Sequence, residues 1–240
     1  MKHETMKVEI WSDVTCNFCY TAKRKFENAL SQFKERDKIE VIWKSFELAP
    51  GLKTDANKKF PHFLAELRSI SLEQAKGMID HVTNAAREAG LAFNLEEAIP
   101  ANSFNAHRLS HLAREQGLQT NAKEKLFAAY FTEGKNIDDI STLIDLADEI
   151  GLDRVEVKNM LQGTKYADEV RQDIDEAKQA DIRSVPHYVF NGKTKLSGAQ
   201  DSTVYLETLG KTFAQWQREN EQTQAETGVG LSCKIGEICD

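Results

Sequence analysis

The sequence predicts an α/β protein in which a long helical block separates two strand-containing segments. Two observations lead to this prediction. The chain opens with a strand–helix–strand pattern and closes with two strands and a helix, whereas its middle shows only helical periodicity. A strand–helix–strand unit normally builds a parallel sheet, so the outer segments form one sheet only if the helical block is an insertion.

The opening unit follows from the alternation and spacing of apolar residues. Residues Lys7 to Ser12 alternate between apolar and polar, as a short strand does, and the apolar residues of segment 20–30 recur at helical spacing. A second strand is predicted from Ile39 to Phe46, where the strand-favouring residues Val and Ile are frequent.

The helical block extends from about Lys58 to Asp181. Its apolar residues recur every three or four positions, and glycines stand near the ends of the predicted helices, as C-terminal glycines do. These glycines are Gly90, Gly117, Gly151 and Gly163.

The closing segment predicts a hairpin followed by a helix. Asn191-Gly192 separates two short extended runs, 187–190 and 193–196, and this dipeptide is a strong signal for a type I′ turn. A last helix is predicted from Ser202 to Glu219. The polar stretch 220–230 is typical of a linker or tail.

Together these elements predict a thioredoxin fold with a large all-helical domain inserted after its first βαβ unit. The predicted parts are a discontinuous thioredoxin-like domain, an inserted helical domain and a tail. Their boundaries are 1–55 plus 182–219, then 56–181, then 220–240.

Charge and hydropathy argue against several classes of function. The net charge is −7 and no basic stripe is present, whereas nucleic-acid binding depends on clustered Lys and Arg. No stretch approaches the ~18 uncharged apolar residues of a membrane helix. Residues 1–5 lack the apolar region of a secretory signal, so we expect a cytoplasmic location.

The four cysteines form two pairs, Cys16/Cys19 and Cys233/Cys239, at opposite ends of the chain. In a reducing compartment such pairs are more often catalytic, redox-sensing or metal-binding than structural. The first pair is a C-x-x-C at the predicted turn from strand into helix, where unpaired N–H groups and the helix dipole favour a thiolate. We therefore expect Cys16 to attack and Cys19, one turn inside the helix, to resolve the mixed disulfide. A C-x-x-C can equally be half of a zinc site, but its position between strand and helix favours redox chemistry.

A proline, Pro186, stands directly before the predicted strand at 187–190. Proline readily takes a cis peptide bond and cannot donate a hydrogen bond to a sheet. An ordinary trans proline at the start of a strand is the alternative that the residues alone leave open.

Several blocks of the chain resemble the FrnE-like branch of the DsbA family. They occur in the family's order across residues 7–215, and they are 13–24, 102–109, 129–134, 184–186, 190–192 and 197–200. The resemblance implies a thiol–disulfide oxidoreductase or isomerase of the predicted fold, with a cis Val185–Pro186 bond facing the Cys16/Cys19 pair.

The resemblance also implies how substrate is held. The backbone of Val185 would pair with an extended substrate segment. From its position directly after Pro186, and apart from the resemblance, His187 could lie near the sulfurs and stabilise a thiolate. Asn17 and Phe18 replace the Pro-Trp that is common in this branch. The strength of the protein as an oxidant and the direction of thiol–disulfide exchange are therefore not inferred from the family. Neither a metal nor an organic cofactor is implied. The implied substrates are protein thiols and disulfides, with glutathione or a thioredoxin system as the recycling partner.

Two other functions stay open. Kappa-class glutathione transferases and 2-hydroxychromene-2-carboxylate isomerases share the inserted architecture. They look like relatives of this family that have a serine at the position of Cys16. The presence of both cysteines favours disulfide exchange over a glutathione-dependent transferase or isomerase. The other alternative is a zinc- or peptide-binding module.

The second pair, Cys233 and Cys239, closes a short loop that contains Gly236. We expect an auxiliary redox couple that exchanges with Cys16 and Cys19. An inert surface disulfide and a zinc site shared by all four cysteines are the alternatives.

Other polar residues are candidates for supporting roles. Glu9, Lys44 and Glu47 lie on or beside the first two strands and could provide a buried proton carrier behind Cys19. His107 and His111 are one helical turn apart, but no matching carboxylate pattern accompanies them, so packing or surface positions are favoured. His107 and its neighbour Arg108 are weaker candidates for residues that line a groove between the two domains.

Overall fold

The sheet has four strands in the order β2-β1-β3-β4 within residues 4–228, the part of the chain that the computed structural model describes, with side chains described to residue 222. The strands are β1 (Met6–Ser12), β2 (Ile39–Ser45), β3 (His187–Phe190) and β4 (Thr194–Ser197). β1 runs parallel to β2 and antiparallel to β3, which is antiparallel to β4. The parallel pair needs a crossover, which helix α1 (Asn17–Gln32) supplies.

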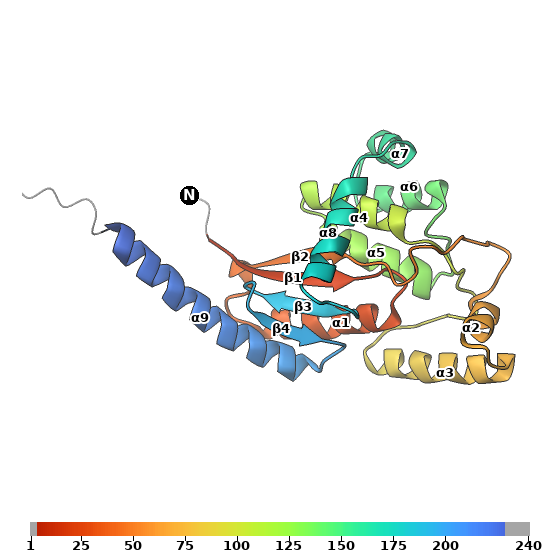
Figure 1. Cartoon of the computed structure of the whole chain (residues 1–240), viewed down its shortest axis with the longest axis horizontal. Coiled ribbons are helices and arrows are strands. Elements are labelled where there is room, and N and C mark those ends of the chain that lie inside the picture. Colours follow the sequence, from red (N-terminus) through yellow and green to blue (C-terminus); the bar gives the residue numbers. More distant parts are fainter. Residues whose placement is uncertain (1–3, 229–240) are drawn as a thin grey trace, which may run out of the picture.

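Only helices lie between β2 and β3, apart from their connecting loops (Figure 1). The predicted α/β fold with a helical insertion is therefore confirmed, whereas the domain boundaries stay a prediction. The inserted helices are α2 (Phe60–Arg68), α3 (Leu72–Glu88), α4 (Phe104–Glu115), α5 (Gln119–Phe131), α6 (Ile140–Asp148), α7 (Arg154–Gln162) and α8 (Ala167–Gln179).

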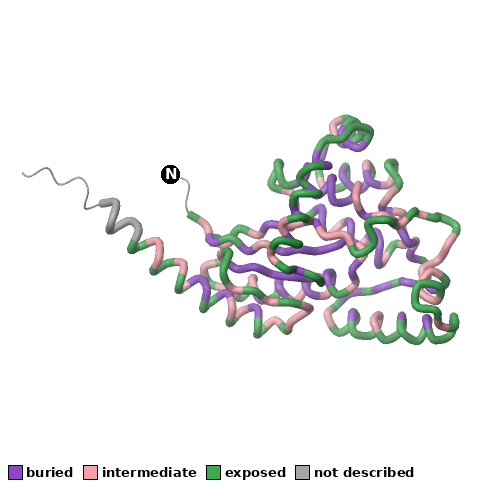
Figure 2. Tube along the Cα trace, viewed as in Figure 1, coloured by how far each residue is buried: buried purple, intermediate pink, exposed green. Residues whose placement is uncertain are grey.

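Helix α1 and the last helix, α9 (Ser202–Gly228), pack together on one face of the sheet. Their apolar side chains interlock with alternate residues of β1 and β3, as strand periodicity requires, and Figure 2 shows these strands as buried. The core on this face contains Val8, Ile10, Phe26, Tyr188 and Leu209. On the other face, Trp11 and Val189 pack against Ala177 of α8.

The insertion covers the free edge of β2 and so joins the two parts of the molecule. The Gln119 amide, at the start of α5, donates to the carbonyl of Trp43 and accepts from its N–H, at 2.9 and 3.0 Å. The Asp173 carboxylate of α8 accepts from the N–H of Ser45 at 2.8 Å. These bonds satisfy backbone groups that an edge strand leaves unpaired.

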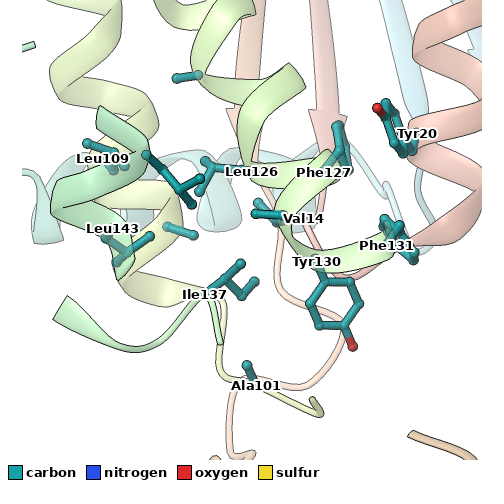
Figure 3. Close-up of a cluster of buried hydrophobic side chains, with 14 of the residues drawn as sticks. Val14, Tyr20, Ala101, Leu109, Leu126, Phe127, Tyr130, Phe131, Ile137 and Leu143 are labelled. Carbon is teal, nitrogen blue, oxygen red and sulfur yellow. The ribbon is translucent and has the colours of Figure 1, made fainter. Parts of the chain in front are cut away.

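The largest apolar core lies in the insertion and includes the beginning of α1. Figure 3 shows Val14 and Tyr20 among the side chains of α5, with Phe127 and Phe131 close to Tyr20. The Tyr20 and Phe127 rings stack at 4.9 Å between centroids. Cys16 and Cys19 belong to the same core, so the insertion surrounds the inner side of the C-x-x-C segment.

Two details differ from the sequence-based predictions. The predicted end of the last helix at Glu219 is wrong, because α9 continues to Gly228. Residues 220–227 are polar but contain neither Gly nor Pro and include the good helix formers Glu, Gln and Ala. In the hairpin, Asn191 and Gly192 both have positive φ, as a type I′ turn requires, but Phe190 pairs with Thr194, so the loop has three residues.

Candidate active site

The loop that follows β1 positions Cys16 at the start of α1. The Asp13 carboxylate accepts hydrogen bonds from the N–H groups of Thr15 at 3.2 Å and Leu48 at 2.7 Å. The N–H of Cys16 donates to the Asp13 carbonyl at 3.2 Å. Cys16 becomes the N-cap of α1 with an extended backbone, and its side chain makes no capping hydrogen bond in the described structure. Cys16 therefore stands at the N-terminal end of α1, where the helix dipole favours a negative charge.

Both cysteines of the motif are free thiols and are largely buried. Cys16 is 4% exposed and Cys19 is 1% exposed, so Cys16 is the more accessible of the two. Burial raises the pKa of Cys19 well above its usual value, and contact with Cys16 raises it further. The Ser12 side chain and the backbone of Asp13 oppose this shift but do not cancel it. Cys19 is therefore a protonated thiol at neutral pH.

The loop before β3 lies opposite the motif. The peptide bond between Val185 and Pro186 is cis, the conformation that the family resemblance implies. The Cys16 thiol donates to the carbonyl of Val185 across 3.7 Å, although 169 residues separate the two in sequence. The carbonyl of Pro186 accepts from the N–H of Gly198 at 2.8 Å, which ties this loop to the end of β4.

The other residues expected to contact substrate lie on both sides of Cys16. Phe18 is 55% exposed, and Asn17 is half-buried in the first turn of α1. His187 is buried, and its Nδ1 shares a hydrogen bond of 2.8 Å with the Ser197 hydroxyl. Burial and the charge of Lys195 lower the pKa of His187, so its ring is neutral at neutral pH. It therefore provides no positive charge for a thiolate at that pH.

Behind Cys19 lies a buried polar cluster, which we define as Asp13, His107 and Lys123. Nε2 of His107 on α4 lies 3.5 Å from Oδ1 of Asp13, and both side chains are almost fully buried. Burial would raise the pKa of Asp13, but His107 and the N–H groups of Leu48 and Thr15 hold it below its usual value. Burial, together with the charge of Lys123, lowers the pKa of His107. The cluster thus holds an ionised Asp13 and a neutral His107.

The three proton carriers expected on or beside the strands differ in their surroundings. Lys44 is bound by Asp173 at 3.0 Å and Glu176 at 2.7 Å, with Glu9 at 3.9 Å. Glu47 is half-buried, and burial together with the charge of Asp13 raises its pKa. Glu9 and Lys44 thus lie on the face of the sheet that α8 covers, whereas α1 covers the other face. A role for Glu47 behind Cys19 stays a prediction.

Lys123 was not among the residues singled out from the sequence, although a signal existed. It lies on the buried stripe of α5, spaced as i, i+3, i+4 and i+7 with Leu126, Phe127 and Tyr130. A lysine in such a stripe is unusual enough to mark the position, because lysine is almost never fully buried without a partner.

Two other polar residues of α4, His111 and Arg108, have structural partners. His111 contacts the Asp173 carboxylate at 3.0 Å and the Ser45 hydroxyl at 3.1 Å. The Arg108 guanidinium donates to main-chain carbonyls at the end of α7, including that of Gly163 at 2.7 Å. Arg108 therefore fixes the connection between α7 and α8. Among residues 4–228, no group of three or more His, Cys, Asp or Glu side chains is arranged to hold a metal ion.

This topology, with a C-x-x-C at the first helix opposite a cis-proline loop, defines a thioredoxin-fold protein with a dithiol site. The chain belongs to the DSBA-like thioredoxin domain family, which its residues 7–210 match. This is a family of thiol–disulfide oxidoreductases. None of the described helices combines the length and apolar character needed to cross a bilayer.

Individual proteins agree with this assignment. The chain is 30% identical over 207 residues to the uncharacterized protein YwbO of Bacillus subtilis, covering 85% of this chain and 96% of YwbO. The crystal structure of a probable DsbA oxidoreductase from Streptomyces coelicolor is similar with a TM-score of 0.80 and 32% identity, covering 97% of this chain and 94% of that one.

More distant structures share the fold alone. The structure of the cytosolic disulfide reductase DsbM from Pseudomonas aeruginosa with GSH is similar to this chain with a TM-score of 0.59 and 16% identity. The match covers 90% of this chain and 99% of that one. A 2-hydroxychromene-2-carboxylate isomerase has a TM-score of 0.61 at 14% identity, covering 91% and 99%.

Proposed function

We propose that this chain is a thiol–disulfide oxidoreductase or isomerase of the FrnE type, acting on protein or small thiols through Cys16 and Cys19. One observation supports this most strongly. The Cys16 thiol stands at the first turn of α1 and contacts the carbonyl of Val185, directly before the cis-proline, while Cys19 is buried behind it.

In the reducing direction, the reaction has two steps. The Cys16 thiolate attacks one sulfur of a substrate disulfide, a bond forms between the two sulfurs, and the other substrate sulfur leaves as a thiolate. Cys19 then loses its proton and attacks the Cys16 sulfur. The bond between Cys16 and substrate breaks, and the two protein thiols end as a disulfide. In the oxidising direction the same steps run in reverse.

Substrate binding is assigned to the surface around Cys16. An extended peptide beside the 184–186 loop would have its backbone next to Val185 and its side chains against the exposed ring of Phe18. Asn17 would border the same surface from the first turn of α1. His187 would contribute by its neutral, buried ring, which fixes the start of β3 through Ser197.

Recycling requires a second thiol or disulfide, for which we propose glutathione or a thioredoxin system in the cytoplasm. The DsbM structure with GSH shows a protein of this fold together with glutathione, which supports that choice. The proposed chemistry needs neither a metal nor an organic cofactor, because the two cysteines carry the electrons.

The second cysteine pair, Cys233 and Cys239, lies outside the described residues. On its sequence we propose an auxiliary couple that exchanges with Cys16 and Cys19. The Cys233→Ser/Cys239→Ser variant should then recycle at a different rate with glutathione. Unchanged turnover would remove this part of the proposal.

The test of the main proposal is trapping of a covalent intermediate. Full-length Cys19→Ser protein, in a background where Cys233 and Cys239 are serine, is incubated with a peptide that contains one disulfide, and the products are analysed by mass spectrometry without reductant. We expect a stoichiometric mixed disulfide between Cys16 and half of the peptide, and catalysed peptide reduction only with the protein that has both cysteines. The matched Cys16→Ser variant should trap nothing. Absence of the adduct from Cys19→Ser contradicts the proposal.

The alternative functions predict other properties for the parent protein and the Cys19→Ser variant. A glutathione-dependent transferase or isomerase would convert a small-molecule substrate and would keep that activity in Cys19→Ser. A zinc- or peptide-binding module would hold stoichiometric zinc, or bind peptide with Cys16 resistant to alkylation.

A further inference from the structure

The loop that follows β2, residues 46–54, borders Cys16 on the side away from the cis-proline. In the sheet, β1 lies between β2 and β3, so the turn after β1 has the end of β2 on one side and the start of β3 on the other. The ends of β1 and β2 are level, because Ser12 pairs with Ser45. Val185 therefore lies on one flank of Cys16, and the 46–54 loop lies on the other.

Within this loop, Leu48 is tied to the turn that carries Cys16. Its N–H donates to the Asp13 carboxylate at 2.7 Å, and the same carboxylate accepts from the N–H of Thr15, the residue before Cys16. The Leu48 side chain is nonetheless 52% exposed, and the exposed ring of Phe18 stands beside Cys16 on α1. A single exposed apolar residue needs no explanation, but two that border one reactive thiol form a surface that suits binding.

One side chain that precedes α4 of the insertion holds the middle of the loop. The amide nitrogen of Asn102 donates to the carbonyls of Pro50 at 3.4 Å and Leu52 at 3.3 Å. The main-chain N–H of Asn102 donates to the Thr54 hydroxyl at 2.9 Å. The amide oxygen of Asn102 accepts from the N–H of Phe104, the first residue of α4, at 2.9 Å. This position therefore uses both the donor and the acceptor of an asparagine amide, a combination that a carboxylate lacks.

Further bonds make the loop a preformed structure. The Thr54 hydroxyl donates to the Asp138 carboxylate at 2.7 Å, which ties the end of the loop to the insertion. The N–H of Leu52 donates to the carbonyl of Ala49 at 3.0 Å and closes a turn within the loop. A binding surface that is already ordered loses little conformational entropy when it receives a ligand.

We propose that Leu48, presented by the 46–54 loop and held there by Asn102, binds an apolar side chain of the substrate on the flank of Cys16 opposite Val185. The occupant is an extended peptide that carries the reacting disulfide and a large apolar residue next to its cysteine. Such segments are normally buried in folded proteins, so the substrate class is unfolded chains. This inference rests on the proposed redox function and adds its substrate class.

The two flanks serve different parts of the peptide. Beside Val185, the peptide meets main-chain groups, and main-chain recognition gives affinity that does not depend on the peptide sequence. Leu48 and Phe18 offer apolar side chains instead, and contacts of this kind discriminate between peptides. Glutathione has no apolar side chain and gains nothing from Leu48.

The experiment compares two synthetic peptides with the reduced full-length protein, in a background where Cys233 and Cys239 are serine. Each peptide has one cysteine, which is linked by a disulfide to thionitrobenzoate. The two residues beside this cysteine are leucine in one peptide and serine in the other. The Cys16 thiolate attacks the peptide sulfur, and thionitrobenzoate departs as a coloured thiolate. Stopped flow measures its release over a range of peptide concentrations.

At low concentration, the parent should react with the leucine peptide at least about tenfold faster than with the serine peptide. Leu48→Ser should raise the half-saturating concentration of the leucine peptide about fivefold and leave the limiting rate within about twofold. Leu48→Met, which keeps a large apolar side chain, should keep the parental preference. Val155→Ser removes an exposed apolar side chain of α7 and should change nothing.

Asn102→Asp tests the tether of the loop. This variant keeps an oxygen for the N–H of Phe104 but loses the donors to the loop, so the preference for the leucine peptide should fall about threefold. Alkylation of Cys16 by iodoacetamide needs no peptide surface and should stay within about twofold of the parental rate in every variant. An equal fall in alkylation would show that the loop supports Cys16 rather than the substrate, which contradicts the inference.

The outcomes separate the substrate inference from the redox function. If the parent releases no thionitrobenzoate from either peptide, the redox function itself fails. If the parent does not distinguish the peptides, or if Leu48→Ser keeps the parental preference, the substrate inference fails alone. An unchanged preference in Asn102→Asp contradicts the tethering role of that residue. Because Leu48 is exposed, its serine variant should fold, and its result decides the inference even where Asn102→Asp does not fold.

Discussion

The two cysteines of one motif lie in different surroundings. Cys16 meets the carbonyl of Val185 and stands beside the exposed ring of Phe18. Cys19, three residues later, faces the interior near Lys123 and the buried carboxylate of Asp13. Three residues are enough for this difference, because Cys16 caps the helix and Cys19 lies one turn inside it.

The two surroundings also come from different parts of the chain. The groups around Cys16 belong to the segments that build the thioredoxin fold, whereas His107 and Lys123 behind Cys19 come from the inserted helices. The loops of the thioredoxin fold thus border the outer sulfur, whereas the insertion buries the inner one.

The largest expected difference is in thiol reactivity. In reduced protein at pH 7, iodoacetamide should alkylate Cys16 at least about 100-fold faster than Cys19, because Cys19 is buried and its raised pKa keeps it protonated. Mass spectrometry of peptides from a time course measures both rates. Equal rates would show that the two sulfurs do not have separate roles.

The two buried lysines should have opposite effects on stability. The pKa of Lys123 is depressed from 10.5 to about 8, so the unfolded chain binds its proton more tightly and the folded state is penalised below pH 8. Lys123→Met should raise the free energy of unfolding at pH 7, by up to about 3 kcal/mol. Lys23→Met removes a paired cation and should lower it by about 1 kcal/mol or more.

Urea unfolding at several pH values measures both lysine effects. The gain in Lys123→Met should shrink as the pH rises from 8 to 10.5, since the ammonium then loses its proton in both states. A loss of stability in Lys123→Met at pH 7 would mean that Lys123 has a charged partner that supports the fold.

A smaller effect is expected at Asp13, on the acid side. Its pKa is lowered in the folded state, so its contribution to stability is present above the unfolded value of about 3.9 and is lost as the pH falls through the folded value. Asp13→Asn should lower the free energy of unfolding at pH 7 by about 1–2 kcal/mol, because one N–H loses an ionised acceptor. Denaturation curves should show that the difference in free energy of unfolding between the parent and Asp13→Asn becomes smaller below pH 4. A difference that stays constant with pH would exclude the ionised carboxylate as its cause.

Local sequence patterns predicted much of the fold and the outer half of the site. The alternation in β1, the Asn191-Gly192 turn and the position of the C-x-x-C are each visible within a few residues. The inner half was not visible in this way, because residues 13, 19, 107 and 123 meet only after the insertion packs on α1. The placement of Lys44 was hidden for the same reason, since the carboxylates that bind it lie on α8.

The most direct test of the redox function is a titration of the full-length protein in glutathione buffers, with Cys16 and Cys19 read by alkylation and mass spectrometry. We expect the pair to convert reversibly between dithiol and disulfide, with a midpoint within the range of cellular thiol couples, about −300 to −120 mV. A pair that stays unreactive across this range, or that retains bound zinc in the reduced protein, would contradict the assignment of Cys16 and Cys19 as the redox centre.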